Sequence, residues 1–368
     1  MSTPETQYFA LLQAALWDKP VATDEPFDWE AVLKIANHHD MGALIGGTAS
    51  QLAGDARPPQ PVLAKMQSAM RGNLVHHMRL KQILLAAVKL LREHGIEPVL
   101  LKGFGLALLY PNPNLRQFGD IDLFVGVDRF HEACALLRTL PGGYNWGEEV
   151  DVGRHYNIEF GGYPMEIHRV SADVAEGKER ERYSAIESDG LLQHPRQVDF
   201  EGFALTVPSN EFQVFFTFFH AWHHFLTTGV GWRQVTDVAM TLHAYHGLLD
   251  TDKLRRWIAD MHLMQPWQTF GYLMVERLGL PEAEMPFYDT HCRRRAQRLY
   301  RRIMATGNFG RKSSFKRSKP RKAGIMRKLH SAVGIFVDFA YRARVFPEAA
   351  FREMGAALKN SFGKFGKN

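Results

Sequence analysis

The feature that most constrains the fold is a short apolar segment that carries two like charges. In residues 120–125 (DIDLFV), Asp120 and Asp122 alternate with apolar side chains. Successive side chains of a β-strand point to opposite faces, so this alternation predicts a strand with one apolar face and one face bearing both carboxylates. Residues i and i+2 lie about 7 Å apart, which lets both carboxylates reach one hard cation. Without a cation each would raise the pKa of the other, so water or a metal ion must offset the pair.

The segments around this strand predict a small mixed sheet. Residues 97–101 (EPVLL) are short and apolar and favour a buried strand, and Lys102-Gly103 follows as a turn. Residues 104–110 (FGLALLY) are expected to form a short helix that Pro111 ends, and residues 120–125 form the second strand. A helical pattern follows residue 128, and two alternating runs joined at Gly161-Gly162 then indicate a β-hairpin. The order is therefore strand, helix, strand, helix, hairpin. The predicted fold class is α+β, with the mixed sheet flanked by helical regions on both sides.

Four segments are expected along the chain. Residues 1–95 have helical patterns, with Gly95 placed to stop a helix, and residues 96–205 hold the α/β core. Residues 206–305 return to helix, with Ser209 as the N-cap and a stripe of phenylalanines after it. Residues 306–368 combine a basic Gly/Ser/Lys/Arg-rich linker with a final amphipathic stretch at about 324–342.

Length and composition exclude several classes of protein. The chain has 368 residues, of which 45% are apolar, so it can bury a substantial core. Its two cysteines, Cys134 and Cys292, match no metal or redox spacing, which argues against a disulfide framework. No basic leader and no apolar run of about 20 residues is present, so neither a signal peptide nor a transmembrane span is predicted. A cytoplasmic location is expected, with peripheral association with the inner membrane as an alternative.

The charge is unevenly distributed. Residues 291–328 contain fifteen Lys/Arg and no Asp or Glu, and removing them from the overall +6 leaves −9 for the other 330 residues. The basic segment and the amphipathic stretch, residues 291–342 together, could bind RNA phosphates or an anionic membrane surface. The alternative is a solvated linker and a helix docked on the acidic body of the same chain.

A third carboxylate strengthens the prediction of a metal site. Glu166 lies in the second run of the hairpin, between Met165 and Ile167, and is expected on the face opposite these two apolar residues. Three carboxylates on adjacent strands would hold two Mg²⁺ ions, with Mn²⁺ as an alternative. Such ions bind nucleotide phosphates, lower the pKa of an attacking hydroxyl and neutralise a leaving pyrophosphate. Phosphoryl-type transfer is the chemistry that needs this arrangement.

Several ordered motifs carry a family resemblance. Residues 101–103 (LKG), Tyr110-Pro111, Arg116, residues 120–125 (DIDLFV) and residues 166–168 (EIH) follow one another in this order. The set resembles the uncharacterised nucleotidyltransferase family within the DNA polymerase β-like superfamily. The resemblance covers residues 95–170 closely and the helical flanks loosely. It implies a polymerase β-like core that transfers a nucleoside monophosphate from an NTP.

The resemblance also implies roles for individual residues. Asp120, Asp122 and Glu166 would be the catalytic metal ligands, and Gly103 would lie against the triphosphate, where the absence of a Cβ permits close approach. Lys102 would bind phosphate as a point charge, and His168 would lie near the nucleotide. The wider superfamily usually has Gly-Ser at the turn, whereas here Phe104 follows Gly103, so no hydroxyl is available to hold a phosphate oxygen.

Other polar residues have two interpretations each. Arg116 would bind the γ-phosphate through two hydrogen bonds or would neutralise Asp120. His155 and His168 would be ligands or catalytic groups at the cleft, or structural histidines of the hairpin. His220, His223 and His224 share one face of a helix, where they would bind zinc, line the cleft or belong to the core. Asp237, by resemblance to the family, is expected to be structural.

The sequence thus predicts a metal-dependent enzyme with an NTP donor, most simply ATP. The expected acceptor is a sugar, a small molecule or a peptide or protein, by analogy with the pathways in which relatives act. One alternative is a non-catalytic protein that binds nucleotide, RNA or a membrane surface through its basic segment. Another is an RNA-tailing enzyme with the same active site and a different acceptor.

Overall fold

The computed structural model describes residues 3–21, 25–145, 155–174, 177–308 and 339–352, and these residues form a mixed α+β fold. The helices are α1 (Thr3–Trp17), α2 (Trp29–His38), α3 (Gly42–Ala49), α4 (Gln60–Glu93), α5 (Phe104–Ala107), α6 (Gly126–Leu137), α7 (Lys178–Glu187), α8 (Asn210–Thr227), α9 (Trp232–Ala244), α10 (Thr251–Asp260), α11 (Met264–Leu278) and α12 (Arg293–Thr306). The strands are β1 (Val99–Leu100), β2 (Ile121–Phe124), β3 (Gly143–Asn145), β4 (His155–Phe160), β5 (Tyr163–His168), β6 (Arg196–Phe200) and β7 (Phe203–Val207). The predicted fold class is confirmed.

The central sheet has five strands in the order β1-β2-β5-β4-β3. Strands β2 and β5 run parallel, and the other neighbours are antiparallel. The hairpin predicted around Gly161-Gly162 is β4–β5, and both glycines have positive φ angles, a conformation that residues with a Cβ rarely adopt. Strands β6 and β7 form a separate two-stranded sheet, which the sequence analysis did not anticipate.

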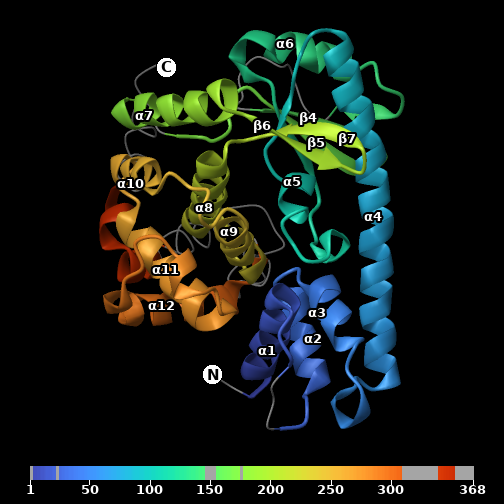
Figure 1. Ribbon diagram of the computed structural model, residues 1–368, viewed down its shortest axis with the longest axis vertical. Coiled ribbons are helices and arrows are strands. Elements are labelled where there is room, and N and C mark those ends of the chain that lie inside the picture. The colour runs from blue at the N-terminus through green and yellow to red at the C-terminus, as the bar shows by residue number, and fades with distance from the viewer. Residues whose placement is uncertain (1–2, 22–24, 146–154, 175–176, 309–338, 353–368) are drawn as a thin grey trace, which may run out of the picture.

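Helix α4 links the two ends of the molecule (Figure 1). Its 34 residues run from beside α3 to the sheet, where the helix contacts α6. The pattern at Leu80–Leu91 belongs to its second half, and Gly95, with φ +70°, follows its end as predicted. The helix therefore connects the N-terminal helices to the sheet as one continuous element.

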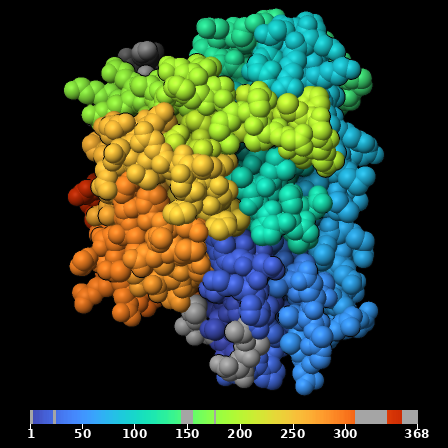
Figure 2. Space-filling model, viewed as in Figure 1, coloured from blue at the N-terminus to red at the C-terminus, as the bar shows by residue number. Residues whose placement is uncertain are grey.

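Two hydrophobic clusters divide the molecule. One unites α1–α3 and the start of α4 with helices α8–α12, although these segments lie at opposite ends of the sequence. The other lies between the second half of α4, the sheet, α6 and the β6–β7 hairpin. Figure 2 shows the N-terminal residues adjoining the C-terminal helices on one face. The first and third of the four expected segments therefore share one hydrophobic core.

The C-terminal helices follow the sequence pattern closely. The Ser209 hydroxyl accepts a hydrogen bond from the backbone N–H of Phe212 at 3.2 Å and caps α8 as predicted. Most of the basic linker and the start of the final amphipathic stretch, residues 309–338, lie outside the described residues. Among the described helices, none is long and apolar enough to cross a membrane.

Candidate active site

Strand register brings the predicted carboxylates together. In the parallel pair β2–β5, Asp122 lies opposite Glu166, while Ile121 and Leu123 lie opposite Met165 and Ile167. All four apolar residues are buried on one face of the sheet. Because side chains alternate along a strand, the other face carries Asp120, Asp122, Glu166 and His168. The sequence prediction that Glu166 lies on a strand next to the two aspartates is confirmed.

Asp122 is the centre of this charged cluster. Its side chain is fully buried, and its Oδ1 lies 3.0 Å from Lys102 Nζ and 3.0 Å from His168 Nε2. His168 Nε2 also lies 3.3 Å from Glu166 Oε2. The second oxygen, Oδ2, is buried and has no hydrogen-bond partner among the described residues. Such an acceptor is costly to bury alone, so an external donor or cation would fit there.

The electrostatics separate the two aspartates. Burial raises the pKa of Asp120, and the Asp122 charge raises it further. Burial also opposes ionisation of Asp122, but the Lys102 ammonium and the His168 hydrogen bond outweigh it and hold its pKa well below the usual range. Burial acts against the charged form of Lys102 as well, yet the three carboxylates raise its pKa overall. Of the two aspartates, Asp122 is therefore firmly ionised, whereas the charge of Asp120 is insufficiently compensated.

The Lys102-Gly103 turn lies against the start of β2. Gly103 has φ +63°, and a Cβ there would lie 3.3 Å from the backbone oxygen of Asp120. Glycine is thus required both by conformation and by close approach. Phe104 is buried and packs edge-on against Phe118, with ring centroids 4.9 Å apart. Position 104, where the resemblance implied a serine, therefore faces the core, which explains why an apolar residue is accommodated.

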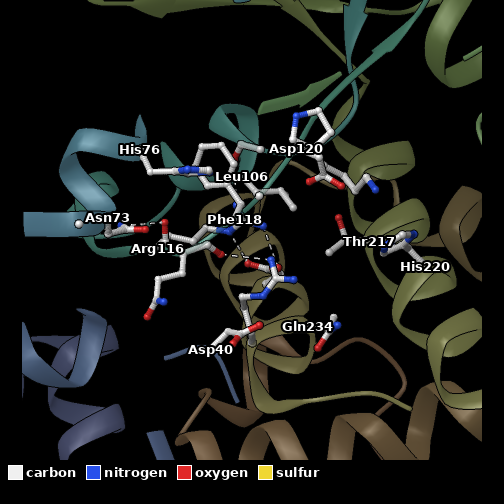
Figure 3. Close-up of a pocket in the computed structure, with 18 of the residues that line it drawn as sticks. Asp40, Asn73, His76, Leu106, Arg116, Phe118, Asp120, Thr217, His220 and Gln234 are labelled. Carbon is white, nitrogen blue, oxygen red and sulfur yellow. Dashed lines mark hydrogen bonds and ion pairs between the residues drawn. The ribbon is translucent and has the colours of Figure 1, made fainter. Parts of the chain in front are cut away.

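The turn and Asp120 open onto a cavity of about 620 Å³ (Figure 3). One wall comes from the sheet side, with Lys102, Gly103 and Asp120. The others come from α4, α8 and α9 and from the segment before α3. The polar residues of this lining that sequence reasoning did not place at the site are Asp40, Asn73, His76, Gln117, Thr217, Arg233 and Gln234. No local motif marks them, because only the packing of the helical regions against the core brings them to the cavity.

Arg116 has a partner that neither sequence interpretation included. Its guanidinium binds the carboxylate of Asp237 on α9 through two hydrogen bonds, Nε to Oδ1 at 2.6 Å and Nη2 to Oδ2 at 2.9 Å. Tyr110 donates to Asp237 Oδ1 at 2.7 Å, and Arg116 Nη1 donates to the carbonyl of Gly103 at 3.0 Å. The expectation that Arg116 neutralises Asp120 through a direct ion pair is therefore wrong. Arg116 joins the Lys102-Gly103 turn to helix α9.

The hairpin and helix histidines lie in separate places. His155, Glu166 and His168 bring three ligand atoms within 4.8 Å of one another, the one grouping of this size that the described residues contain. His155 Nε2 is 3.9 Å from Glu166 Oε2. His220 and His224 on α8 lie with their Nε2 atoms 2.9 Å apart, and His220 lines the cavity. The hairpin histidines thus extend the carboxylate cluster, whereas His220 of α8 lies in the wall of the cavity.

The donor set fits a hard divalent cation. Asp120, Asp122 and Glu166 offer carboxylate oxygens on one sheet face, which is the ligand type that Mg²⁺ and Mn²⁺ prefer. The unpartnered Oδ2 of Asp122 provides an acceptor that no described group of the chain uses. Lys102 and His168 hold the other oxygen of the same carboxylate. The chain thus supplies positive groups on one side of Asp122 and leaves the other side for a ligand.

Comparisons with known proteins found one family model and similar solved structures. A family model described as an uncharacterised nucleotidyltransferase matches residues 25–279. The solution structure of the antibiotic-resistance factor ANT(2'')-Ia is similar at 17% identity and a TM-score of 0.35, over 50% of this chain and 91% of that one. An antigenic nucleotidyltransferase-like protein from Paracoccidioides brasiliensis matches at 15% identity and a TM-score of 0.36, over 57% and 94%. No curated protein matches the chain.

Proposed function

The chain belongs to the uncharacterised nucleotidyltransferase family, and on this premise we propose that it moves a nucleoside monophosphate from an NTP to an acceptor. Pyrophosphate is released, and the reaction depends on a divalent metal ion. ATP is the proposed donor, and Mg²⁺ is the proposed ion, with Mn²⁺ as a substitute. The proposed acceptor is a sugar, another small molecule or a peptide.

One observation carries the proposal. Asp122 and Glu166 are register neighbours on parallel strands, and Asp120, two residues before Asp122, opens onto the 620 Å³ cavity. Three carboxylates on one sheet face repel one another, and a bound cation would offset the repulsion that remains beside Lys102 and His168. We assign Asp120, Asp122 and Glu166 as the ligands of that ion. A bound divalent ion would polarise the phosphates and help neutralise the charge that grows on pyrophosphate.

The chain's own groups have complementary roles at the phosphates. Lys102 lines the cavity and carries a charge that the three carboxylates stabilise, so it can attract a triphosphate while it holds Asp122 in place. Gly103 lets the nucleotide approach the turn closely. His168 keeps Asp122 and Glu166 oriented through its Nε2. Arg116 acts on the nucleotide indirectly, because its bond to the Gly103 carbonyl fixes the turn.

The test follows the label from α-labelled NTPs into a cell extract divided into protein, nucleic-acid, glycan and small-molecule fractions. We expect the wild-type chain with Mg²⁺ to label one fraction and Glu166→Gln, which removes one carboxylate charge at nearly constant size, to label none. Label in the nucleic-acid fraction would favour an RNA-tailing enzyme. Equal labelling by wild type and Glu166→Gln, or no labelling with any NTP, would contradict the proposal.

A further inference from the structure

Helix α4 presents small residues and hydrogen-bonding side chains to the cavity. Ala69, Gly72, Asn73 and His76 line it and follow one another at spacings of three, one and three residues, so they share one face of the helix. We call these four residues the α4 wall. Figure 3 shows Asn73 and His76 on one side of the cavity and Thr217 of α8 on the other. None of the four takes part in the proposed binding of metal or phosphate.

Gly72 lies in the interior of α4, a 34-residue helix, where glycine is less favourable than alanine. Its φ angle is not positive, so the backbone conformation does not require a glycine. A Cβ at this position would meet no atom of the described chain within 4 Å outside its own stretch of helix. Packing within the described residues therefore does not require a glycine either. The missing side chain leaves space on the cavity side of the helix, where a ligand can approach the backbone closely.

Asn73 provides a hydrogen-bond acceptor whose orientation the chain fixes. The residue is 8% exposed, and its Nδ2 donates to the backbone carbonyls of Asn114 at 2.6 Å and Arg116 at 3.4 Å. Two carbonyl acceptors require the amide nitrogen to face them, so the amide oxygen Oδ1 points elsewhere. This oxygen has no hydrogen-bond partner among the described residues. The α4 wall thus contains a nearly buried acceptor that a donor of a bound ligand can satisfy.

His76 adds a second hydrogen-bonding group to this wall. Burial lowers its pKa, against a smaller opposing effect of the Phe118 backbone, so the imidazole is neutral at pH 7. A neutral imidazole has one nitrogen that donates and one that accepts, and Nε2 of His76 is buried without a partner among the described residues. The His76 ring lies 5.1 Å from the ring of Tyr163, and Pro164, the next residue of β5, also lines the cavity. Neutral hydrogen-bonding groups and an apolar ring therefore bound this part of the cavity.

The α4 wall adjoins the turn that is proposed to bind the triphosphate. Phe118 connects the two, because a Cβ on Gly103 would lie 3.4 Å from its ring, and its ring centroid lies 4.5 Å from that of His77 on α4. A nucleotide whose phosphates lie at Lys102 and Gly103 can therefore extend its base along α4. The part of the lining that comes from α9 carries the charged Arg233 instead. A base is flat and uncharged, so the neutral α4 wall matches it better.

We propose that the α4 wall binds the base of the nucleotide and selects adenine and cytosine, the bases with an amino group beside a ring nitrogen that accepts, an inference that rests on the proposed nucleotidyl transfer. Asn73 Oδ1 accepts a hydrogen bond from the amino group, and His76 donates to the ring nitrogen. Gly72 lets the ring lie against the helix. Guanine carries an oxygen in place of this amino group, and that oxygen would face the Asn73 oxygen with no proton between them.

The experiment measures the affinity of three probes by calorimetry, each with Mg²⁺. They are ATP, ITP, which has an oxygen in place of the adenine amino group, and inorganic tripolyphosphate, which has no base. We expect the wild type to bind ATP about 10-fold more tightly than ITP. Gly72→Leu fills the space beside the helix with a residue that favours helix, so it should fold and weaken ATP binding about 10-fold while tripolyphosphate binding stays the same.

Two further variants complete the comparison. His76→Phe keeps an aromatic ring and removes the ring nitrogens, so the difference between ATP and ITP should shrink to about 3-fold. Ala64→Leu changes an exposed position of α4 outside the cavity lining, and as the matched control it should leave all three affinities unchanged.

The other outcomes overturn the assignment. Equal affinities of the wild type for ATP and ITP would exclude recognition of the amino group. Unchanged ATP affinity in Gly72→Leu would place the base elsewhere, and an equal loss of ATP and tripolyphosphate binding would mean that the leucine acts on the phosphates. If Gly72→Leu does not fold, an unchanged preference for ATP over ITP in His76→Phe contradicts the proposal. If the wild type binds neither ATP nor tripolyphosphate, the proposed nucleotidyl transfer itself fails, whereas equal affinity for these two removes only the base site.

Discussion

Two buried ionic clusters lie on either side of the Lys102-Gly103 turn, and they differ in how completely the chain satisfies them. In the cluster of Arg116, Asp237 and Tyr110, both oxygens of the carboxylate accept hydrogen bonds from the chain. In the cluster of Asp120, Asp122, Glu166, Lys102 and His168, one oxygen of the Asp122 carboxylate has no partner among the described residues. We call the first the closed cluster and the second the open cluster.

The difference distinguishes a cluster that stabilises the fold from one that can bind a ligand. In a closed cluster, hydrogen bonds and ion pairs within the chain offset the free-energy cost of burying the charges. Removing one member leaves a buried charge without its partner and destabilises the fold. An open cluster retains a carboxylate oxygen to which a ligand can bind. Carboxylates with shifted pKa values in a cavity are typical of functional sites. Both clusters contain a basic residue that sequence reasoning placed at the nucleotide. Only the contacts distinguish Lys102, which lies beside the unsatisfied carboxylate, from Arg116, which is fully engaged.

The largest expected effect comes from neutralising the open cluster. Asp120→Asn should lower nucleotidyl transfer about 1,000-fold, equivalent to about 4 kcal/mol of transition-state stabilisation, because a metal ligand is lost. It should also raise the melting temperature measured in EDTA. The raised pKa of Asp120 means that the folded state disfavours its ionised form, so removing the charge removes a penalty at neutral pH.

The exposed Asp128 on α6 provides the control for this variant. Asp128→Asn should change neither activity nor melting temperature beyond experimental error. A drop in stability of Asp120→Asn in EDTA would mean that the open cluster is satisfied within the chain, and the contrast with the closed cluster would disappear.

The closed cluster should respond in the opposite way. Asp237→Asn leaves the Arg116 charge buried with weaker partners, so we expect the free energy of unfolding to fall by about 3–5 kcal/mol in urea titrations. Adding Arg116→Met should recover most of that loss, because no uncompensated charge remains and the asparagine oxygen still accepts from Tyr110. A double variant as unstable as the single one would show that the ion pair is not the source of the effect.

Two buried histidines give the smallest test, through pH. Burial lowers the pKa of His77, whose Nε2 bonds the Arg116 carbonyl at 2.9 Å, to about 4. Between pH 6.5 and 4 only the unfolded chain takes up this proton. The free energy of unfolding should therefore decrease by up to about 3 kcal/mol as the pH is lowered through this range. Urea unfolding of His77→Gln should show a flatter decline over this range. An equally steep decline would exclude His77 as its cause.

His168 should behave oppositely in metal-free protein. Burial opposes its charged form, but hydrogen bonds to Asp122 and Glu166 raise its pKa overall. Its contribution to stability is therefore complete below pH 6.5 and is lost as pH rises through the raised folded value. The stability contribution of His77, beside the closed cluster, is thus lost as the pH falls, whereas that of His168, in the open cluster, is lost as the pH rises.

The local part of the site was predictable from sequence. The alternation at Asp120 and Asp122 predicted their strand, and the Gly161-Gly162 turn predicted the hairpin that carries Glu166. Ser209 predicted the start of α8. Each of these features depends on residues within a few positions of one another, where backbone geometry and side-chain alternation are sufficient. The family resemblance added the roles, and the family is confirmed.

The remaining part depended on contacts between distant segments. Arg116 and Asp237 are 121 positions apart, and no periodicity links them. The sharing of one hydrophobic cluster by the N-terminal helices and α8–α12 likewise follows from tertiary packing, and it brings Asp40 and Gln234 to one cavity. The assignment of Asp120, Asp122 and Glu166 as metal ligands stays a prediction that needs measurement.

That measurement is a calorimetric titration of Mg²⁺ and a non-hydrolysable ATP analogue into wild type and into Asp120→Asn with Asp122→Asn. If the open cluster holds the metal and nucleotide, the wild type binds both together and binds the analogue much more weakly in EDTA, while the double variant shows no metal-dependent binding. Unchanged affinity of the folded double variant for the analogue with Mg²⁺ would contradict the account.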